Sequence, residues 1–180
     1  MNSPSVQAVA RDGEHRFSKS LAETIEIVAG IGVAGDVHAG EKVQHLSRVR
    51  ANPAQPNLRQ VHLIHSELFD ELGKSGFSIQ PGDLGENITT RGIDLLSLGR
   101  DTLLKIGGDA VLRVTGLRNP CGQIDDFAPG LLKHVVNKTD QGIVRKAGIM
   151  TVAVSSGMVR PGDPITVESL SGLHIPLERV

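Results

Sequence analysis

Four Gly-Asp dipeptides divide the chain into short segments, and proline precedes two of them. Glycine accepts positive φ angles and aspartate hydrogen-bonds its own backbone, so this dipeptide is typical of tight turns. The apolar runs between the turns are short and rich in β-branched residues, which favours strands over helices. The chain is therefore expected to fold as many short strands with frequent reversals. The dipeptides stand at 35–36, 82–83, 108–109 and 162–163.

The apolar runs predict strands at 5–10, 24–29, 59–64, 148–157 and 163–168, and a hairpin over 102–117 that turns at Gly107-Gly108. Helical spacing of apolar residues predicts only two helices, over 66–76 and 128–138. Ser66 is the expected N-cap of the first helix, and Asp125-Asp126 are expected to cap the second. Many strands and few helices favour a mainly β fold, a β-barrel with a few short α-helices, and not a βαβ series.

The composition excludes several classes of protein. Nineteen Lys and Arg nearly balance twenty Asp and Glu, and the aromatic residues are four Phe without Tyr or Trp. Neither a basic nucleic-acid footprint nor a base-stacking platform is expected. No apolar run is long enough to cross a membrane, and the N-terminus lacks a signal-peptide pattern, so the expected location is the cytoplasm. The 180 residues suffice for one domain.

Glycines 30, 32 and 35 spell G-x-G-x-x-G after an apolar run, which is the spacing of a dinucleotide-binding fingerprint. That motif requires a helix opening at its last glycine and an acidic residue about twenty positions later. The segment after Gly35 has weak apolar periodicity and two prolines, and the region around Gln55 offers no acid. Two interpretations remain: a strand followed by a glycine turn, and a loop whose backbone approaches a ligand. In either case the loop should not open a helix.

Cys121 is the only cysteine, which excludes an internal disulfide and a multi-cysteine metal site. It lies between Pro120 and Gly122, so a turn is expected there, and turn residues are usually exposed. Arg118 would favour its reactive thiolate form. The alternative is a small buried hydrophobic residue. His62 and His65, in the stretch VHLIH, would face opposite sides of a strand, so they are not expected to share a metal.

Several stretches, in this order, resemble the MOSC domain, the module named after the C-terminal part of molybdenum cofactor sulfurase. The resemblance runs from about residue 6 to about residue 167 and is nearest to the small stand-alone bacterial members. It implies a single domain over 1–180 with a β-barrel fold. The stretches are GIGVAGDVHAG, RQVHLI, PGDLGENITTRGIDLLSL, LRNPCGQID and GIVRKAGIMTVAVSSGMVRPGD.

The resemblance also implies a site. Cys121 matches the family's cysteine, which carries sulfur as a persulfide or ligates molybdenum in a pterin cofactor, so Cys121 is the expected catalytic residue and molybdenum ligand. Glycines, amides and cations suit an anionic cofactor, since backbone N–H groups and positive charges bind phosphate. The residues expected to bind the molybdenum cofactor are Lys19, Gly35, Asp36, His38, Glu86, Asn87, Arg118, Asn119 and Arg145.

The function expected from this resemblance is cysteine-dependent sulfur transfer, or molybdenum-cofactor-linked reduction of N-hydroxylated or related small substrates. Larger family members carry a pyridoxal phosphate domain that generates persulfide, or an additional N-terminal barrel. This chain is therefore expected to need an external sulfur donor or reductase, with a small molecule as substrate and neither nucleic acid nor membrane as partner. Two alternatives remain: a non-catalytic module that binds a small anion or the cofactor, and an interaction domain. The catalytic interpretation places the Gly35-Asp36 loop beside Cys121.

Overall fold

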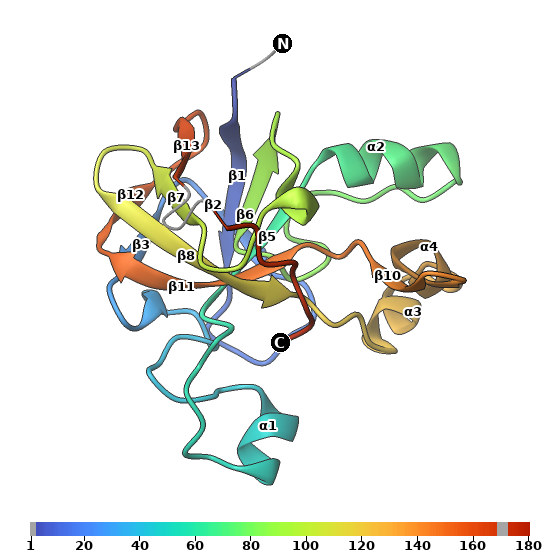
Figure 1. Ribbon diagram of the computed structural model, residues 1–180, viewed down its shortest axis with the longest axis horizontal. Coiled ribbons are helices and arrows are strands. Elements are labelled where there is room, and N and C mark those ends of the chain that lie inside the picture. The colour runs from blue at the N-terminus through green and yellow to red at the C-terminus, as the bar shows by residue number, and fades with distance from the viewer. Residues whose placement is uncertain (1–2, 169–172) are drawn as a thin grey trace.

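The protein is described by a computed structural model that covers residues 3–168 and 173–180, and its main element is one mixed sheet of eight strands (Figure 1). The strand order is β13-β7-β8-β11-β5-β6-β1-β2, and among these neighbours only β5 and β6 run parallel. The strands are β1 Ser5–Arg11, β2 Ser20–Ala22, β5 Val61–His65, β6 Ile88–Arg91, β7 Leu103–Ile106, β8 Ala110–Leu117, β11 Ile149–Ser155 and β13 Ile165–Glu168.

Two smaller sheets and several short helices complete the fold. The sheet β12-β3-β4 is antiparallel, and β9 and β10 form a separate hairpin that lies near α3 and α4 in Figure 1. The strands are β3 Ile25–Val28, β4 Gly32–Val33, β9 Val136–Thr139, β10 Gly142–Arg145 and β12 Gly157–Val159. The helices are α1 Leu46–Ala51, α2 Glu67–Lys74, the 3-10 turn η1 Leu95–Ser97, α3 Gln123–Phe127 and α4 Leu132–Val135.

The mainly β class and all the strands expected from the sequence are confirmed, but a closed barrel is not. The described sheet ends at β13 on one side and at β2 on the other. An isolated bridge joins Ser5 to Pro164, and the amide of Val6 donates to the carbonyl of Asp163 at 2.9 Å. The start of β1 therefore contacts the segment that leads into β13, although no continuous ladder closes the sheet there.

Alternation along the β7–β8 hairpin explains how the sheet forms its core. Leu104 and Ile106 are fully buried, while Lys105 between them is exposed, as expected for a strand with one face against the core. Leu112 and Val114 on β8 are buried in the same cluster, opposite exposed Arg113. The hairpin therefore contributes one apolar face to a core that most of the other strands of this sheet also line.

The helices α2, α3 and α4 pack on a second apolar cluster outside this core. Leu68 and Leu72 of α2 are buried there, together with Ile124 of α3 and Val135 of α4. The helix expected over 66–76 is confirmed, although the Ser66 side chain makes no capping hydrogen bond to it. None of the described helices is long and apolar enough to cross a membrane.

The helix expected over 128–138 is mostly wrong. Only Leu132–Val135 is helical, and Val136 is already extended, at φ −141° and ψ 120°, where β9 begins. β9 pairs with β10 across a tight turn, so inter-strand hydrogen bonds replace the helical ones. Of the expected pair Asp125-Asp126, Asp125 caps α4, since its Oδ1 accepts a hydrogen bond from the Leu132 amide at 2.8 Å, whereas Asp126 lies within α3 and does not serve α4 in this way.

The glycine stretch forms a hairpin and opens no helix. β3 pairs with β4 through Ile27 with Val33 and Val28 with Gly32, and the next helix begins only at Leu46. Gly32 has φ +115°, and a Cβ there would lie 3.0 Å from the Gln60 backbone oxygen. The strand-and-turn interpretation of G-x-G-x-x-G is therefore correct, and the dinucleotide interpretation lacks its helix.

Candidate functional site

Cys121 lies in the turn between β8 and α3, at the edge of a cavity of about 600 Å³. The turn is held by the Ile124 amide, which donates to the Cys121 carbonyl oxygen at 3.0 Å. The thiol is half-buried, and Sγ donates a weak hydrogen bond to Gln123 Oε1 at 3.5 Å. Cys121 is thus one wall of a cavity and not a core residue, which rejects its interpretation as a buried hydrophobic residue.

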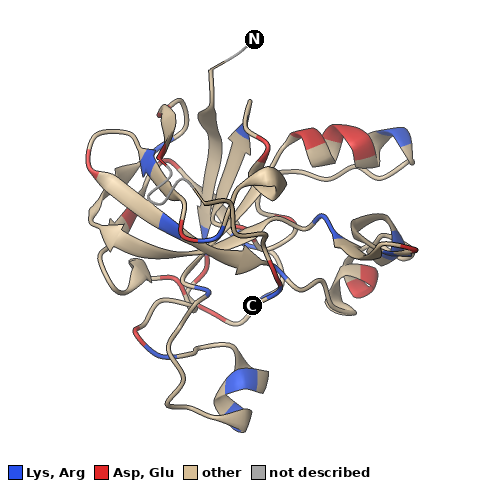
Figure 2. Cartoon of the chain, in the orientation of Figure 1, with Lys and Arg blue, Asp and Glu red and all other residues tan. Residues whose placement is uncertain are grey.

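The cavity is lined by basic side chains from segments far apart in the sequence. Among its described lining residues there is no aspartate or glutamate. Figure 2 shows that α1, one of the elements that contribute to this lining, carries only positive charge. An environment of this kind attracts anions. The basic lining residues are His15, Arg16, Lys19, His38, His45, Arg48, Arg50, Arg59, His62 and Arg118.

A buried ion pair supports one side of this cavity. Lys19, in the loop before β2, places Nζ 2.8 Å from Oδ2 and 3.0 Å from Oδ1 of Asp36. The Lys19 side chain is 3% exposed, and that of Asp36 is not exposed at all. Burial alone would raise the pKa of Asp36, but hydrogen bonds from His38 and the charge of Lys19 outweigh it and hold that pKa well below its usual range.

Asp36 accepts further hydrogen bonds that fix other residues of the site. Asn87 Nδ2 donates to Oδ2 at 2.9 Å, the His38 amide donates to Oδ1 at 3.0 Å, and the Asp12 amide donates to Oδ2 at 3.2 Å. The His38 ring also places Nδ1 3.3 Å from Oδ1. Lys19, His38 and Asn87 line the cavity, whereas Asp36 lies behind them and positions all three.

Two arginines that line the cavity, Arg59 and Arg118, interact electrostatically with Cys121. Burial, followed by the positive charges of Arg48 and Arg118, lowers the pKa of Arg59 to about 10, and a negative charge on Cys121 opposes this shift. Burial likewise lowers the pKa of Arg118, with Cys121 and then Glu86 opposing it. Arg59 Nε and Arg118 Nη1 are buried without a hydrogen-bond partner among the described residues. Unpaired buried donors of this kind are costly unless a ligand accepts from them.

The histidines of the cavity are crowded by the same cations. Burial and then the charge of Arg118 lower the pKa of His62 well below its usual value, so the ring is neutral and its Nε2–H donates to the Ala147 carbonyl at 2.8 Å. Burial and then Arg59 lower the pKa of His45. The described residues contain no cluster of three or more His, Cys, Asp or Glu suited to holding a metal.

The structure brings most of the expected site residues to one cavity. Cys121, Lys19, His38, Asn87, Arg118 and Asn119 all line it. Gly35 lies behind the wall with Asp36, in a positive-φ conformation, and a Cβ there would meet Arg11 Nη1 at 2.8 Å. The Gly35-Asp36 loop thus contributes His38 to the cavity that Cys121 lines, and Asp36 itself acts from behind.

Glu86 and Arg145 were expected to bind the cofactor, but neither lines the cavity. The geometry therefore does not favour direct contact between either side chain and a ligand in it. Glu86 is fully buried, and its Oε1 accepts from the Gly82 amide at 2.6 Å and from Thr89 Oγ1 at 3.0 Å. Arg145 donates from Nε to Asn119 Oδ1 at 3.3 Å and so orients a cavity residue. Arg145 therefore acts on the site through Asn119, whereas the hydrogen bonds of Glu86 join residues outside the cavity lining.

Sequence reasoning missed most of the cations, including Arg48, Arg50, Arg59 and His45. One signal could have found them: the chain contains no Asp or Glu from residue 42 to residue 66, while this stretch carries several Arg and His. Such a segment is unusual in a chain whose charges nearly cancel. It forms α1, its flanking loops and β5, and it supplies a large share of the cavity's positive charge.

These features define a small β-rich domain with a cationic cavity around a single thiol, a type of site that suits an oxyanion-bearing small molecule. The family model for the MOSC domain matches residues 34–166. The chain belongs to the MOSC domain family, which is associated with molybdenum-cofactor-related sulfur chemistry or N-hydroxylated substrates. No curated protein matches the chain.

Solved structures share the fold. YuaD from Bacillus subtilis has a TM-score of 0.77 at 23% identity, with 94% of this chain and 98% of that one covered. YiiM from Geobacillus stearothermophilus has a TM-score of 0.67 at 16% identity, covering 96% and 80%. YiiM from Escherichia coli has a TM-score of 0.63 at 15% identity, covering 94% and 72%. At these identities the likeness concerns the fold alone.

Proposed function

We propose that this chain is a cysteine-dependent enzyme of molybdenum-cofactor chemistry, with Cys121 as its reacting thiol. It either transfers sulfur through Cys121 or, with Cys121 as a ligand of the cofactor's molybdenum, reduces small N-hydroxylated substrates. The observation that supports this proposal is the position of the chain's single thiol on a cavity that is also lined by four arginines without an ion pair among the described residues, namely Arg48, Arg50, Arg59 and Arg118. Membership of the MOSC domain family supports the choice of cofactor.

The cavity residues fit an anionic pterin cofactor. Arg59 and Arg118 offer buried N–H groups that no described protein atom accepts, and a phosphate supplies oxygens for them. A volume of about 600 Å³ lies within the range of small-molecule and cofactor sites. Arg59, Arg118 and Asn119 would hold the phosphate and the ring system, and the Cys121 thiolate is a soft ligand suited to a metal such as molybdenum.

When bound, the cofactor supplies a redox-active metal, which is chemistry that side chains alone lack. The chain's residues bind and orient around it. Arg59 and Arg118 line the cavity together with Cys121, and their positive charges suit an anionic ligand beside the thiol. The Arg118 guanidinium lies over the Phe17 ring, with Cζ 5.7 Å from the ring centroid, and this cation–π contact limits the movement of the cation.

Sulfur transfer would use the same thiolate as a nucleophile. Cys121 attacks the outer sulfur of a donor persulfide, a new S–S bond forms to Cys121, and the S–S bond of the donor breaks as its thiolate leaves. No oxidant is consumed, because the persulfide passes from one thiol to another. The donor is an external persulfide-bearing partner in this proposal, and the reductive alternative instead requires an external reductase.

A non-catalytic binding module is the second candidate, because the cavity cations bind an anion whether or not the thiol reacts. Metal and pterin analysis of protein from a host that makes the cofactor separates the two. Wild type, Cys121→Ser, Arg59→Gln and a charge-matched control, Arg113→Gln on the exposed face of β8, are compared for molybdenum, pterin, and activity with a persulfide donor or an N-hydroxylated substrate plus reductant.

The proposal expects cofactor in wild type and in Arg113→Gln, less cofactor in Arg59→Gln, and no activity in Cys121→Ser. Retained activity in Cys121→Ser would show that the thiol is not catalytic. Cofactor bound equally by wild type and Cys121→Ser, with activity in neither, would favour the binding module. Wild type that carries no pterin and gains no activity would contradict the proposal.

A further inference from the structure

The helix α1 lies in an arm, residues 41–57, that projects from the rest of the molecule (Figure 1). Backbone hydrogen bonds close the base of the arm, from the Val43 amide to the Gln55 carbonyl at 3.0 Å and from the Asn57 amide to the Glu41 carbonyl at 2.9 Å. None of the α1 residues is buried. A helix this short normally gains most of its stability from packing on a core, and α1 has no such packing. Burial therefore does not explain why the arm is present.

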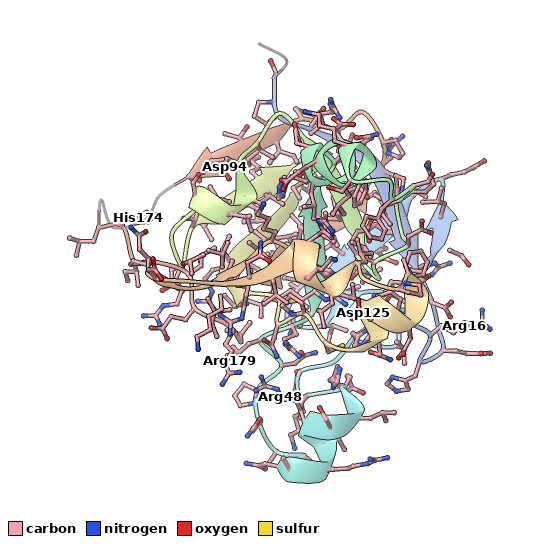
Figure 3. The ribbon with its side chains drawn as sticks, turned by 90° about the vertical axis from the view of Figure 1, so that its right-hand side faces the viewer. Arg16, Arg48, Asp94, Asp125, His174 and Arg179 are labelled. Atoms are coloured by element: carbon pink, nitrogen blue, oxygen red, sulfur yellow. The ribbon has the colours of Figure 1, made fainter. Side chains whose placement is uncertain are left out.

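The arm brings two arginines to the cavity. Arg48 is half-buried and Arg50 is exposed, and both line the cavity that contains Cys121. Figure 3 labels Arg48 on the side of α1 toward the body of the molecule. Among the described residues neither arginine makes an ion pair, and α1 contains no acidic residue. The charge of Arg48 also lowers the pKa of Arg59, so these cations repel one another where no protein anion separates them.

The cavity cations fall into three groups by partner. Lys19 is neutralised by Asp36. Arg16 pairs with Asp12 at 3.3 Å and with Glu14 at 2.7 Å. The remaining arginines have no carboxylate within ion-pair distance among the residues described. They are Arg48, Arg50, Arg59 and Arg118.

These four arginines divide into two pairs by position. Arg59 and Arg118 have buried N–H groups and interact electrostatically with Cys121, so they suit the cofactor phosphate. Arg48 and Arg50 come from the arm, where Arg48 is half-buried and Arg50 is exposed, and among the described residues neither has a buried N–H group that lacks a hydrogen-bond partner. One phosphate beside the thiol would leave the arm pair without an anion.

We propose that Arg48 and Arg50 form a second anion subsite at the mouth of the cavity, which binds a carboxylate or phosphate group of the substrate. The substrate is then an anionic small molecule, and the arm distinguishes it from neutral compounds of the same shape. This inference rests on the proposed function for the identity of the reacting cavity. The arm cations recognise the far end of the substrate, while the reacting group lies near Cys121.

Isothermal titration calorimetry on the full chain tests the subsite without any need for turnover. The two probes are benzamidoxime and its para-carboxylate, which are N-hydroxylated compounds that differ by one negative charge. Wild type is compared with the double variant Arg48→Gln/Arg50→Gln. The control is Lys105→Gln/Arg113→Gln, which removes the same charge from exposed positions on β7 and β8.

We expect the carboxylate to bind wild type and the control about tenfold more tightly than the neutral probe, and we expect the arm variant to lose this preference. Equal affinity of wild type for both probes, or a preference that survives in the arm variant, would overturn the subsite. A lower pterin content in the arm variant would also overturn it, since the arm would then hold the cofactor.

The same measurement separates this inference from the proposed function. The wild-type preference for the carboxylate is measured on protein with and without cofactor. If preparations contain no pterin and Cys121→Ser remains as active as wild type, but the arm-dependent preference persists, the subsite stands and the proposed chemistry is wrong. If cofactor and thiol-dependent activity are found but the preference is absent, the proposed function stands and the subsite is rejected.

Discussion

Replacement of Asp36 by asparagine tests whether the buried ion pair organises the cavity. The carboxylate is not exposed at all, the Lys19 side chain is 3% exposed, and the contact distances are 2.8 and 3.0 Å. Asparagine keeps the size of the side chain and one carbonyl oxygen, but it removes the negative charge. The Lys19 ammonium is then left in the interior without a counter-ion.

The expected cost is large because removal of one partner from a buried ion pair destabilises a protein by about 3–5 kcal/mol. Asp36 also accepts hydrogen bonds from Asn87, from two amides and from the His38 ring, so asparagine loses acceptor capacity as well. Lys19→Met should cost less, about 1–3 kcal/mol, since these other donors still serve the carboxylate. A domain with about 5–15 kcal/mol of total stability would therefore fold only marginally with Asp36→Asn.

Urea unfolding, followed by circular dichroism, measures the difference in unfolding free energy, with a constant m-value as the check on two-state behaviour. The matched control is Asp109→Asn, an exposed aspartate in another Gly-Asp dipeptide, for which a change within about 0.5 kcal/mol is expected. If Asp36→Asn loses less than about 1 kcal/mol, as an exposed aspartate would, the buried pair does not organise the site.

Three further predictions concern the same framework. The pKa of Asp36 lies below that of an unfolded aspartate, so the unfolded state binds more protons than the folded state in acid. The free energy of unfolding of the wild type should therefore decrease as the pH falls below about 4, and it should decrease more steeply than that of Asp36→Asn. Urea unfolding over that pH range measures both. Asn87→Asp should cost about 3 kcal/mol in thermal unfolding, because it places a second buried carboxylate beside Asp36; a loss under about 1 kcal/mol would contradict this. Gly148→Ala should lower the free energy of unfolding by about 2 kcal/mol or more, because φ is +86° and a Cβ would overlap the Leu63 carbonyl oxygen. A urea midpoint equal to that of the wild type would refute this.

Local signals in the sequence predict the strands and turns well. The β7–β8 hairpin follows from Gly107-Gly108 and the alternation of Leu104 and Ile106, which act over a few residues. The failure at 128–138 came from apolar residues at helical spacing whose backbone pairs with β10 instead, and Val136 takes the extended conformation that β-branched residues favour. The parallel pairing of β5 with β6 depends on contacts distant in sequence, and no local signal carries it.

The candidate site could be predicted only in part. Cys121 and Arg118 are close in sequence, and the family resemblance supplied Lys19 and Asn87, which the fold brings to the same cavity. The role of Asp36 behind the cavity wall could not be predicted, because its partners are brought to it by tertiary structure. The arm cations were missed because charged residues on a short, unburied helix are ordinarily solvated, and only the fold shows which cavity they line.

The rate of alkylation of Cys121 tests the central claim most directly, namely that this thiol reacts inside an anion-binding cavity. Iodoacetate and iodoacetamide differ mainly in one negative charge, and each rate is measured relative to free cysteine by intact-protein mass spectrometry. We expect low salt to favour iodoacetate by about tenfold in wild type and in Arg113→Gln, and we expect Arg59→Gln to reduce this preference. Equal relative rates for the two reagents in wild type, at low and at high salt, would contradict the account.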